Sequence, residues 1–340
     1  MTALLDSVSL EALRGKKNLL AFSGGVDSTA LFFLLMEAGV EFDIAIVNYN
    51  TRASSKDEEE YARELGSKYG KKCFVLSANQ PQTNFEAEAR RIRYEFFEEI
   101  IAEHGYCNLV TAHQLNDKLE WFLMRFAKGA GVRELSGMKA VSKKDDHTVV
   151  KPLLKTSKNS LYEYLKARKI KYFEDESNDD KSYERNYFRH EFSNAFLDKF
   201  ESGVARSFEI LGSEATMFES EFFRLGSLVV FKSISKDKDI SNAALALKQI
   251  GYLPSFAQRD EIGEKFDAVV GGAFCVAKSK DGYVYVTPYM SETMQKEFKE
   301  ACRVSLVPSK VRGYLSKNGV NPKNLKSEID YFFGCVGGVR

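Results

Sequence analysis

The stretch LLAFSGGVDSTALFFLL, residues 19–35, joins an expected strand to an expected helix through a glycine-containing turn. Leu19 to Phe22 are apolar, as a strand buried on both faces of a parallel sheet requires. From Thr29 onward the apolar residues predict a largely buried helix. Two adjacent glycines let the backbone approach an anion, and the helix N-terminus offers free N–H groups and a positive dipole end. The stretch therefore predicts a phosphate-binding turn.

This turn differs from the two most familiar phosphate loops. It lacks the Gly-Lys-Ser/Thr of a Walker A loop and the G-x-G-x-x-G spacing of a dinucleotide site. A plain strand-to-helix turn capped by serine is the structural alternative. Asp27 would repel a phosphate unless a cation lay between them, so we expect Mg²⁺ at Asp27. The predicted nucleotide-binding residues of the turn are Ser23, Gly24, Gly25, Val26, Asp27 and Ser28.

Composition limits the class of protein. The chain has 340 residues, which suggests two or three domains, and a net charge of +1, so any basic surface is local. Its five cysteines are dispersed without a C-x-x-C pair, which argues against zinc ribbons and cysteine-held clusters and fits a reducing compartment. We find no signal-peptide pattern and no apolar run of about 18 residues. We therefore expect a cytoplasmic protein that does not span a membrane.

The first half of the chain alternates strand and helix patterns, which predicts an α/β fold with a doubly wound parallel sheet. Ligands of such sheets bind outside the carboxyl ends of the strands. The Ser23–Ser28 turn, Asn48–Arg52 and Thr111–Asp117 all follow expected strands, so we expect them to share one cleft. The expected strands are 18–22, 42–48, 72–77, 107–112 and 147–151, and the expected helices are 28–38, 56–69, 85–104 and 115–128.

The second half predicts further helices and a hairpin. A basic amphipathic helix is expected over 155–171, followed by a helix containing RNYFRHEF. Residues 204–231 predict one long helix, and KSISKDKDIS, residues 232–241, predicts a linker. Asp281-Gly282 marks the turn of a hairpin over 272–289. We expect a catalytic domain over 1–200, a helical connector over 201–231 and a small α+β domain over 232–340.

Several motifs together resemble one enzyme family. SGGVDS is similar to the pyrophosphate-binding loop of the N-type ATP pyrophosphatases, whose fold is adenine nucleotide alpha hydrolase-like. Four further segments resemble the tRNA(Ile)-lysidine synthetases: NFEAEARRIRYEFF (84–97), TAHQLNDKLEWFLMRFAKGAGVRELSGM (111–138), KPLL (151–154) and EDESNDDKSYERNYFR (174–189). The resemblance implies that ATP and Mg²⁺ bind at the turn and that O2 of cytidine 34 in a CAU-anticodon tRNA(Ile) attacks the α phosphate. Free L-lysine then displaces AMP, giving lysidine and changing the codon read from AUG to AUA.

Three residues of 111–138 are candidate catalytic groups beside Asp27. Asp117 and Glu120 are three apart on an expected helix and share a face, which suits the cationic lysine or a second metal contact. The alternative is a solvated acidic face paired with Lys118 and Arg125. His113 ends a strand at the expected cleft, where it either accepts a proton from lysine or is structural.

Basic residues supply the candidate substrate contacts. Arg185 and Arg189 lie one helical turn apart and make a fork for phosphate, whereas ordinary helix solvation explains at least one of Arg90, Arg91 and Arg93. The helix over 155–171 either holds the tRNA backbone or is simply a packed amphipathic helix. The residues implied to bind substrate are Arg90, Arg93, Arg185, Asn186 and Arg189, and Arg52 is implied to bind the nucleotide.

The chain departs from the family pattern at several positions. Tyr49 and Asn50 replace imidazoles before Arg52, and Asn116 replaces the first acid of an Asp-Asp pair. Lys118 and Trp121 stand where the family has Gln and Thr. Because the turn and Glu120 are intact, we interpret these changes as divergence within the family.

Methionine tRNAs also carry a CAU anticodon, so contacts outside the anticodon must distinguish tRNA(Ile) from methionine tRNA. We assign these contacts to residues 232–340. A dimerisation or folding module is the alternative for that region. Rival functions are a tRNA sulfurtransferase, which usually needs cysteine pairs, and GMP- or NAD-synthetase-like amidation, which does not explain RNYFR or HQLND. A P-loop kinase would release ADP rather than AMP. A non-catalytic RNA-binding module would release no pyrophosphate.

Overall fold

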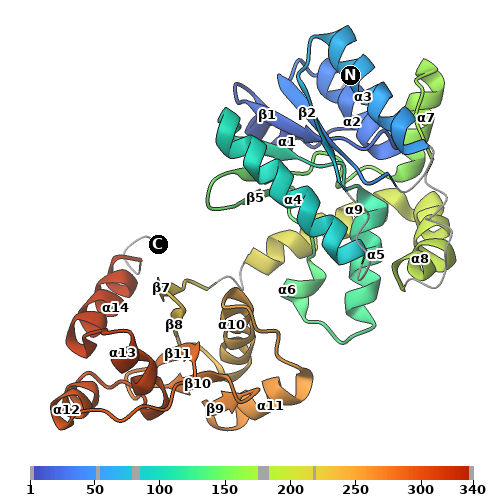
Figure 1. Ribbon diagram of the computed structural model, residues 1–340. Coiled ribbons are helices and arrows are strands. Elements are labelled where there is room, and N and C mark those ends of the chain that lie inside the picture. Colours follow the sequence, from blue (N-terminus) through green and yellow to red (C-terminus); the bar gives the residue numbers. More distant parts are fainter. Residues whose placement is uncertain (1–3, 51–53, 79–84, 175–183, 217–219, 337–340) are drawn as a thin grey trace. The chain divides into compact units, whose positions relative to one another are not determined.

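The computed structural model describes residues 4–50, 54–78, 85–174, 184–216 and 220–336 (Figure 1). It divides into two compact units, Met1–Met217 and Phe218–Arg340. The first unit therefore runs past the expected boundary at residue 200, and the second begins before the expected boundary at 232. Residue Arg52, one of the predicted nucleotide contacts, lies outside the described residues.

A six-stranded sheet forms the centre of the first unit, in the order β3-β2-β1-β4-β6-β5. All neighbouring pairs are parallel except β5 with β6, so the doubly wound α/β prediction is confirmed. The unexpected β5 is a short edge strand that turns back on β6. The strands are β1 Asn18–Ala21, β2 Phe42–Asn48, β3 Cys73–Ser77, β4 Asn108–Val110, β5 Val141–Lys143 and β6 Thr148–Val150.

Helices cover both faces of this sheet because successive strand residues point to opposite sides. Leu20, Ile44 and Val110 face a large cluster that includes residues of α1, α2, α3 and α7. Leu19, Ala45 and Leu109 face the residues of α4 instead. The helices are α1 Ser7–Leu13, α2 Val26–Glu37, α3 Ser54–Tyr69, α4 Phe85–His104, α5 Leu115–Phe126, α6 Val132–Leu135 and α7 Lys158–Arg168.

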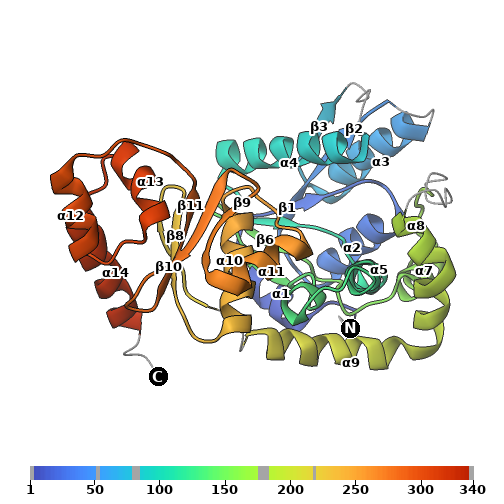
Figure 2. The same cartoon turned by 90° about the horizontal axis from the view of Figure 1, so that it is seen from below.

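The helical segment before the unit boundary contains a π-helical turn. α8 (Glu184–Phe188) runs through the π turn η2 (Arg189–Ser193) into α9 (Asn194–Thr216), as the labels in Figure 2 allow the reader to follow. α9 packs through Leu197 and Phe208 against Leu115 and Leu119 of α5. The predicted basic helix is shorter than expected, because Ser157 caps its start and Lys169 takes a left-handed conformation at its end.

The second unit is an antiparallel sheet in the order β7-β8-β11-β10-β9, covered on both faces. Leu228 and Val230 face one cluster, and Val229 and Phe231 face the other. The elements are β7 Phe223–Leu225, β8 Leu228–Lys232, α10 Lys236–Gln249, α11 Phe256–Lys265, β9 Asp267–Val270, β10 Phe274–Lys278, β11 Tyr283–Pro288, α12 Lys296–Val304, the 3-10 turn η3 Ser309–Val311, α13 Arg312–Lys317 and α14 Pro322–Val336. The α+β prediction and the hairpin turn at Asp281-Gly282 are confirmed.

Two sequence-based predictions about residues 204–241 were wrong. The helix ends at Thr216, and the apolar run Leu228–Phe231 is a strand that pairs with β7 through a turn in which Gly226 has φ +57°. The expected linker over 232–241 contains the start of α10, capped by Ser235. Its buried Asp239 accepts bonds from Ser233 and from the Ile234 N–H, so this polar sequence is ordered by its own hydrogen bonds.

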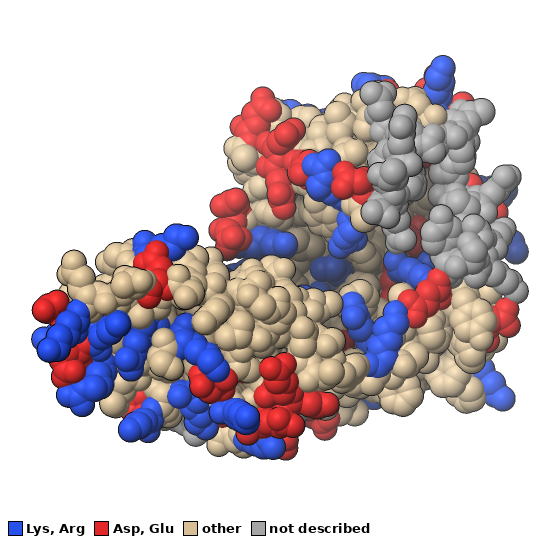
Figure 3. All heavy atoms as spheres, turned by 60° about the horizontal axis from the view of Figure 1, so that its bottom comes forward, with Lys and Arg blue, Asp and Glu red and all other residues tan. Residues whose placement is uncertain are grey.

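The surface carries charged side chains of both signs. Basic and acidic side chains both occur across the face drawn in Figure 3, in keeping with the net charge of +1. Among the described residues, no helix combines the length and apolar character needed to cross a bilayer.

Candidate functional site

The Ser23–Ser28 turn joins β1 to α2 and is closed by its own hydroxyl groups. Ser28 Oγ donates to the Gly25 carbonyl (3.2 Å) and accepts from the Ser23 N–H (3.2 Å), while Thr29 Oγ1 donates to the Gly24 carbonyl (3.1 Å). Gly25 is the N-cap residue of α2, and no side chain of the described residues caps the helix there. The first N–H groups of α2 are therefore available to an anion.

Gly24 explains why the turn needs glycine. It has φ +77°, a conformation that other residues rarely adopt. Its carbonyl accepts from the Phe173 N–H (3.0 Å), and a Cβ at this position would lie 3.3 Å from the Phe173 ring and 3.5 Å from Glu58 Cβ. The turn is thus held against residue 173, which follows α7 in the chain.

Asp27 lies in the first turn of α2 with a carboxylate oxygen, Oδ1, that is buried and has no hydrogen-bond partner among the described residues. Burial, together with the neighbouring charge of Asp117, raises the pKa of this carboxyl to about 7. A carboxylate without a compensating donor is unfavourable in the free protein. A bound cation would remove that penalty.

The donor set at this place fits Mg²⁺ rather than a metal held by protein ligands alone. No group of three His, Cys, Asp or Glu among the described residues could hold a metal ion. Mg²⁺ is usually bound by one or two carboxylates together with substrate phosphates and waters. Asp27, with its unpartnered oxygen beside a phosphate-binding turn, matches that pattern.

α5 begins at the carboxyl end of the neighbouring strand β4. Gln114 caps the helix and accepts from the Asn116 N–H (2.6 Å), while Asp117 Oδ2 accepts from the Gln114 N–H (2.9 Å). Asn116, which replaces an acid of the family pattern, forms two side-chain hydrogen bonds. Its amide nitrogen donates to Asn194 Oδ1 (2.9 Å), and its amide oxygen accepts from the Lys158 N–H (3.0 Å). Asn116 therefore joins α5 to α7 and α9.

His113 lies between β4 and α5, and its Nδ1 is 2.9 Å from the Thr111 hydroxyl. Burial lowers the pKa of His113 to about 4, although the charge of Asp117 acts in the opposite direction. The ring is therefore uncharged at neutral pH. A neutral ring with this pKa is a weak proton acceptor and a suitable hydrogen-bonding group.

A cluster of two carboxylates and two guanidinium groups links α5 to α8 and η2. Arg185 Nε donates to Glu120 Oε2 (2.7 Å), and its Nη2 donates to Asp117 Oδ1 (2.5 Å). Arg189 Nε donates to Glu120 Oε1 (2.9 Å), and Nη1 donates to Asn186 Oδ1 (3.2 Å). The Glu120 side chain is 1% exposed and that of Asp117 14% exposed, so Asp117 is the more accessible carboxylate.

The structure thus brings Asp117 and Glu120 onto one face, as predicted, but that face is not a solvated acidic surface. Neither Lys118 nor Arg125 is its partner, because Lys118 Nζ lies over the Phe208 ring (4.9 Å) and the Arg125 guanidinium over the Trp121 ring (4.3 Å). The charges of Asp117, Glu120 and Arg189 all act on the Asp27 carboxyl. The turn and this cluster therefore form one electrostatic site.

The arginines of α4 separate into two groups. Arg91 forms exposed ion pairs with Glu88 (2.9 Å) and Glu95 (2.7 Å), as expected for helix solvation. Arg90 packs over Tyr94 (4.7 Å), and its charge helps to lower the pKa of His113. Arg93 is exposed, and no contact of it is described.

Two contributors to the site were not predicted as such. Tyr49 donates from its phenol to the Ala89 carbonyl (2.5 Å), so a departure from the family pattern joins the end of β2 to α4. Lys151, in the KPLL segment, has its pKa lowered to about 8 by burial and by the charge of Arg90. The sequence signal that could have identified Lys151 as a site residue is the position of KPLL directly after a strand.

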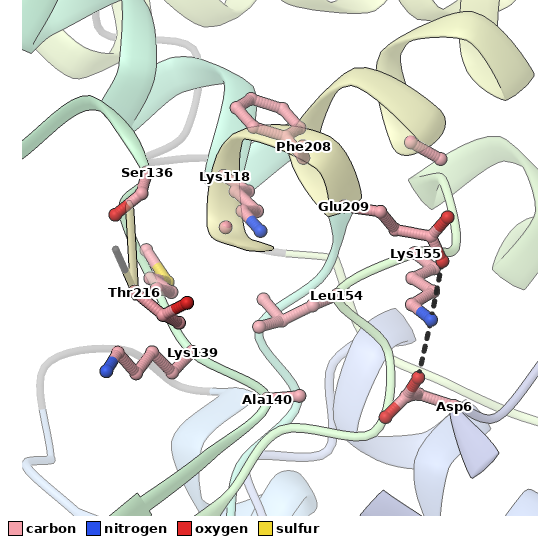
Figure 4. A pocket seen from close by; sticks show the side chains of 13 residues that line it. Asp6, Lys118, Ser136, Lys139, Ala140, Leu154, Lys155, Phe208, Glu209 and Thr216 are labelled. Atoms are coloured by element: carbon pink, nitrogen blue, oxygen red, sulfur yellow. Dashed lines mark ion pairs between the residues drawn. The ribbon is translucent and has the colours of Figure 1, made fainter. Parts of the chain in front are cut away.

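A separate cavity of about 260 Å³ lies between α5, α9 and the segment after β6, and Figure 4 shows its lining. None of the predicted site residues lines it. Lys155 Nζ contacts both Asp6 (2.8 Å) and Glu209 (2.7 Å), which ties α9 to the N-terminal helix. The ion-paired side chains of this cavity have a structural role.

Comparison with known proteins gives consistent matches. Residues 4–196, more than half of the chain, match the family described as the PP-loop domain. A Campylobacter jejuni protein named tRNA(Ile)-lysidine synthase is 41% identical over 319 residues, covering 93% of this chain and 97% of the relative. Proteins of the same name from Wolinella succinogenes and Helicobacter pylori are 40% and 38% identical, covering 92% and 90% of this chain and 96% and 91% of the relatives.

A likeness among solved structures agrees with the fold. The U34-tRNA thiolase NcsA from Methanococcus maripaludis, solved with its 4Fe-4S cluster, aligns with a TM-score of 0.50. The alignment covers 62% of this chain and 75% of that chain at 17% identity. At this identity the likeness concerns the fold alone.

Proposed function

The chain belongs to the tRNA(Ile)-lysidine synthase family, whose PP-loop domain it carries, and on that basis we propose that it ligates lysine to C2 of cytidine 34 in the CAU anticodon of tRNA(Ile). ATP is consumed, and the anticodon changes from reading AUG to reading AUA. The observation that supports this most is the convergence at adjacent strand ends of an anion-binding turn, an unpartnered Asp27 oxygen and the Asp117–Glu120–Arg185–Arg189 cluster.

For the first half-reaction, the backbone of Ser23–Ser28 and α2 would bind the phosphates of ATP, with Arg52 as a further contact. Asp27 would hold Mg²⁺, which supplies positive charge to offset that of the phosphates. O2 of cytidine 34 forms a bond to the α phosphorus as the bond to the bridging oxygen breaks, releasing pyrophosphate. Arg185 and Arg189, positioned by Glu120, are placed to face the charge of the adenylated base.

For the second half-reaction, an amine of lysine releases a proton to solvent and forms a bond to C2 as the C2–O2 bond breaks, so that AMP leaves with that oxygen. We assign Asp117 to the lysine ammonium group because its side chain is more accessible than that of Glu120. His113, held neutral, orients the reactants by hydrogen bonding rather than by acting as a strong base. We assign Arg90 and Arg93 to contacts with the RNA. Asn186 is assigned to positioning Arg189, which donates a hydrogen bond to it.

The second unit would supply the contacts that separate tRNA(Ile) from methionine tRNA, since both carry CAU. Exposed lysines of α13 and α14, among them Lys317 and Lys323, support that role because they can contact tRNA phosphates. Free L-lysine as the second substrate, a homodimeric assembly and a cytoplasmic location belong to the same proposal.

The proposal is tested by incubating the protein with ATP, Mg²⁺, labelled lysine and a tRNA(Ile) transcript. We expect label in the RNA, with AMP and pyrophosphate formed in equal amounts and only when the transcript is present. ADP as product would indicate kinase chemistry. RNA binding without any nucleotide turnover would indicate a non-catalytic RNA-binding module.

A further inference from the structure

Four large aromatic side chains lie exposed on the helical segment that begins with Arg185 and Arg189 and continues into α9. Tyr187, Phe192, Phe196 and Phe200 are 47%, 45%, 48% and 46% exposed. Each follows the previous one by five or four residues along the chain, which is about one helical turn. We call these four residues the aromatic stripe.

The aromatic stripe consists of two contacting pairs of rings, one on each side of the junction between η2 and α9. A π turn closes i→i+5 bonds and so contains about one residue more than an α turn. The five-residue step from Tyr187 to Phe192 crosses η2, and their ring centroids are 5.8 Å apart. The four-residue step to Phe200 lies in α9, where the Phe196 and Phe200 rings are 5.0 Å apart.

The stripe is not needed for the core of the first unit. α9 already buries Leu197 and Phe208 against α5. Burying an aromatic side chain is strongly favourable, so two neighbouring pairs of half-exposed rings mark a surface that contacts another molecule.

The surroundings of the stripe favour one kind of partner. It begins within the helical segment that carries Arg185 and Arg189, which bind the carboxylates of the site. At its far end, Lys199 Nζ lies over the Phe200 ring at 5.4 Å. Aromatic faces next to cations are the combination that binds single-stranded nucleic acid, because bases stack while the cations approach the phosphates.

We propose that the aromatic stripe is a stacking platform for the unpaired anticodon-loop nucleotides that flank cytidine 34. This inference rests on the proposed function, which requires a base to be unstacked and brought to the site. Nucleotides beside an extruded base lose their own stacking partners. Rings that begin beside the catalytic cluster would replace those partners.

The test uses the full-length protein and an anticodon stem–loop RNA with a CAU loop carrying 2-aminopurine next to the anticodon. Wild type should quench the fluorescence on binding. Phe196→Ala with Phe200→Ala should weaken binding by at least about fivefold for each ring that stacks. The variants Phe196→Trp and Phe200→Trp should bind as wild type does, whereas Leu at both positions should behave as Ala does.

Ile210→Ala is the matched control, because Ile210 is 47% exposed in the part of α9 that lies beyond the kink at Phe200, where φ is −127°. Unchanged RNA affinity in the double Ala variant would overturn the stacking proposal. So would full binding with Leu at both positions, or a wild-type dimer in sedimentation that the Ala variant loses. Lysidine formation by wild type is measured in parallel: its absence refutes the proposed function, whereas its presence with unchanged RNA affinity refutes the platform alone.

Discussion

Asp27 has a buried carboxylate oxygen, Oδ1, that no donor among the described residues contacts. Its pKa is raised to about 7 by burial and then by Asp117, so the folded protein binds a proton here more tightly than the unfolded chain does. A raised carboxyl pKa means that stability falls as pH rises from near 4 to above 7. In the protein without nucleotide, Asp27 therefore lowers the free energy of unfolding at pH 8 and has almost no effect on it at pH 4.

Asp27→Asn should therefore increase the free energy of unfolding of the nucleotide-free protein at pH 8 by up to a few kcal/mol, and by less at pH 5. Denaturant titration at the two pH values measures this difference. The same variant should lose pyrophosphate release. Addition of Mg²⁺ and ATP should stabilise wild type and leave the variant nearly unchanged, whereas equal stabilisation of both proteins would remove the metal from Asp27.

Glu120 differs from Asp27 in having two guanidinium partners. Glu120→Gln leaves Arg185 and Arg189 without their shared charge and should lower the free energy of unfolding by about 3–5 kcal/mol. The exposed pair of Lys128 and Glu184 is the control, and Glu184→Gln should cost less than about 1 kcal/mol. Denaturant titration measures the free energy of unfolding of both variants. Similar small decreases in the two variants would mean that the cluster does not hold α5 to α8.

At the scale of elements, the turn between β1 and α2 owes its shape to Gly24. Gly24→Ala should strain the backbone by about 1–2 kcal/mol and also push the turn away from Phe173. Gly39→Ala adds the same kind of strain, at φ +66°, with no atom within 4 Å. We expect a larger loss in melting temperature for Gly24→Ala than for Gly39→Ala, and weaker ATP binding, measured by calorimetry, for Gly24→Ala alone. Equal ATP affinities of the two variants would show that the position of the turn does not matter for ATP binding.

Sequence reasoning succeeded where local patterns decide the element. The apolar strand followed by a glycine turn, and the Asp281-Gly282 turn between the apolar runs of β10 and β11, are recognisable from the local sequence alone. It failed over 204–241, because Leu228–Phe231 has the same apolar character in a helix or a strand, and only Gly226 and the pairing with β11 separate the two. The pairing of Glu120 with two arginines depends on residues 65 and 69 positions away, and no local pattern could give it.

At the scale of the whole molecule, each unit has its own cores. Every cluster of buried apolar residues that the structure describes falls within one unit, three in the first and two in the second. A fragment beginning at Phe218 should therefore fold alone and unfold cooperatively, as measured by circular dichroism and calorimetry. A fragment that is unfolded, or that melts without a transition, would show that the second unit depends on the first.

The most direct test of the account is to identify the product nucleoside in two transcripts. Isoleucine tRNA and methionine tRNA, both with CAU anticodons, are incubated with the full-length protein, ATP, Mg²⁺ and labelled lysine, and the digested RNA is analysed by mass. We predict lysidine at position 34 of the isoleucine transcript and none in the methionine transcript. Label in another nucleoside, or no label although AMP and pyrophosphate form on the RNA, would contradict lysine ligation to cytidine 34.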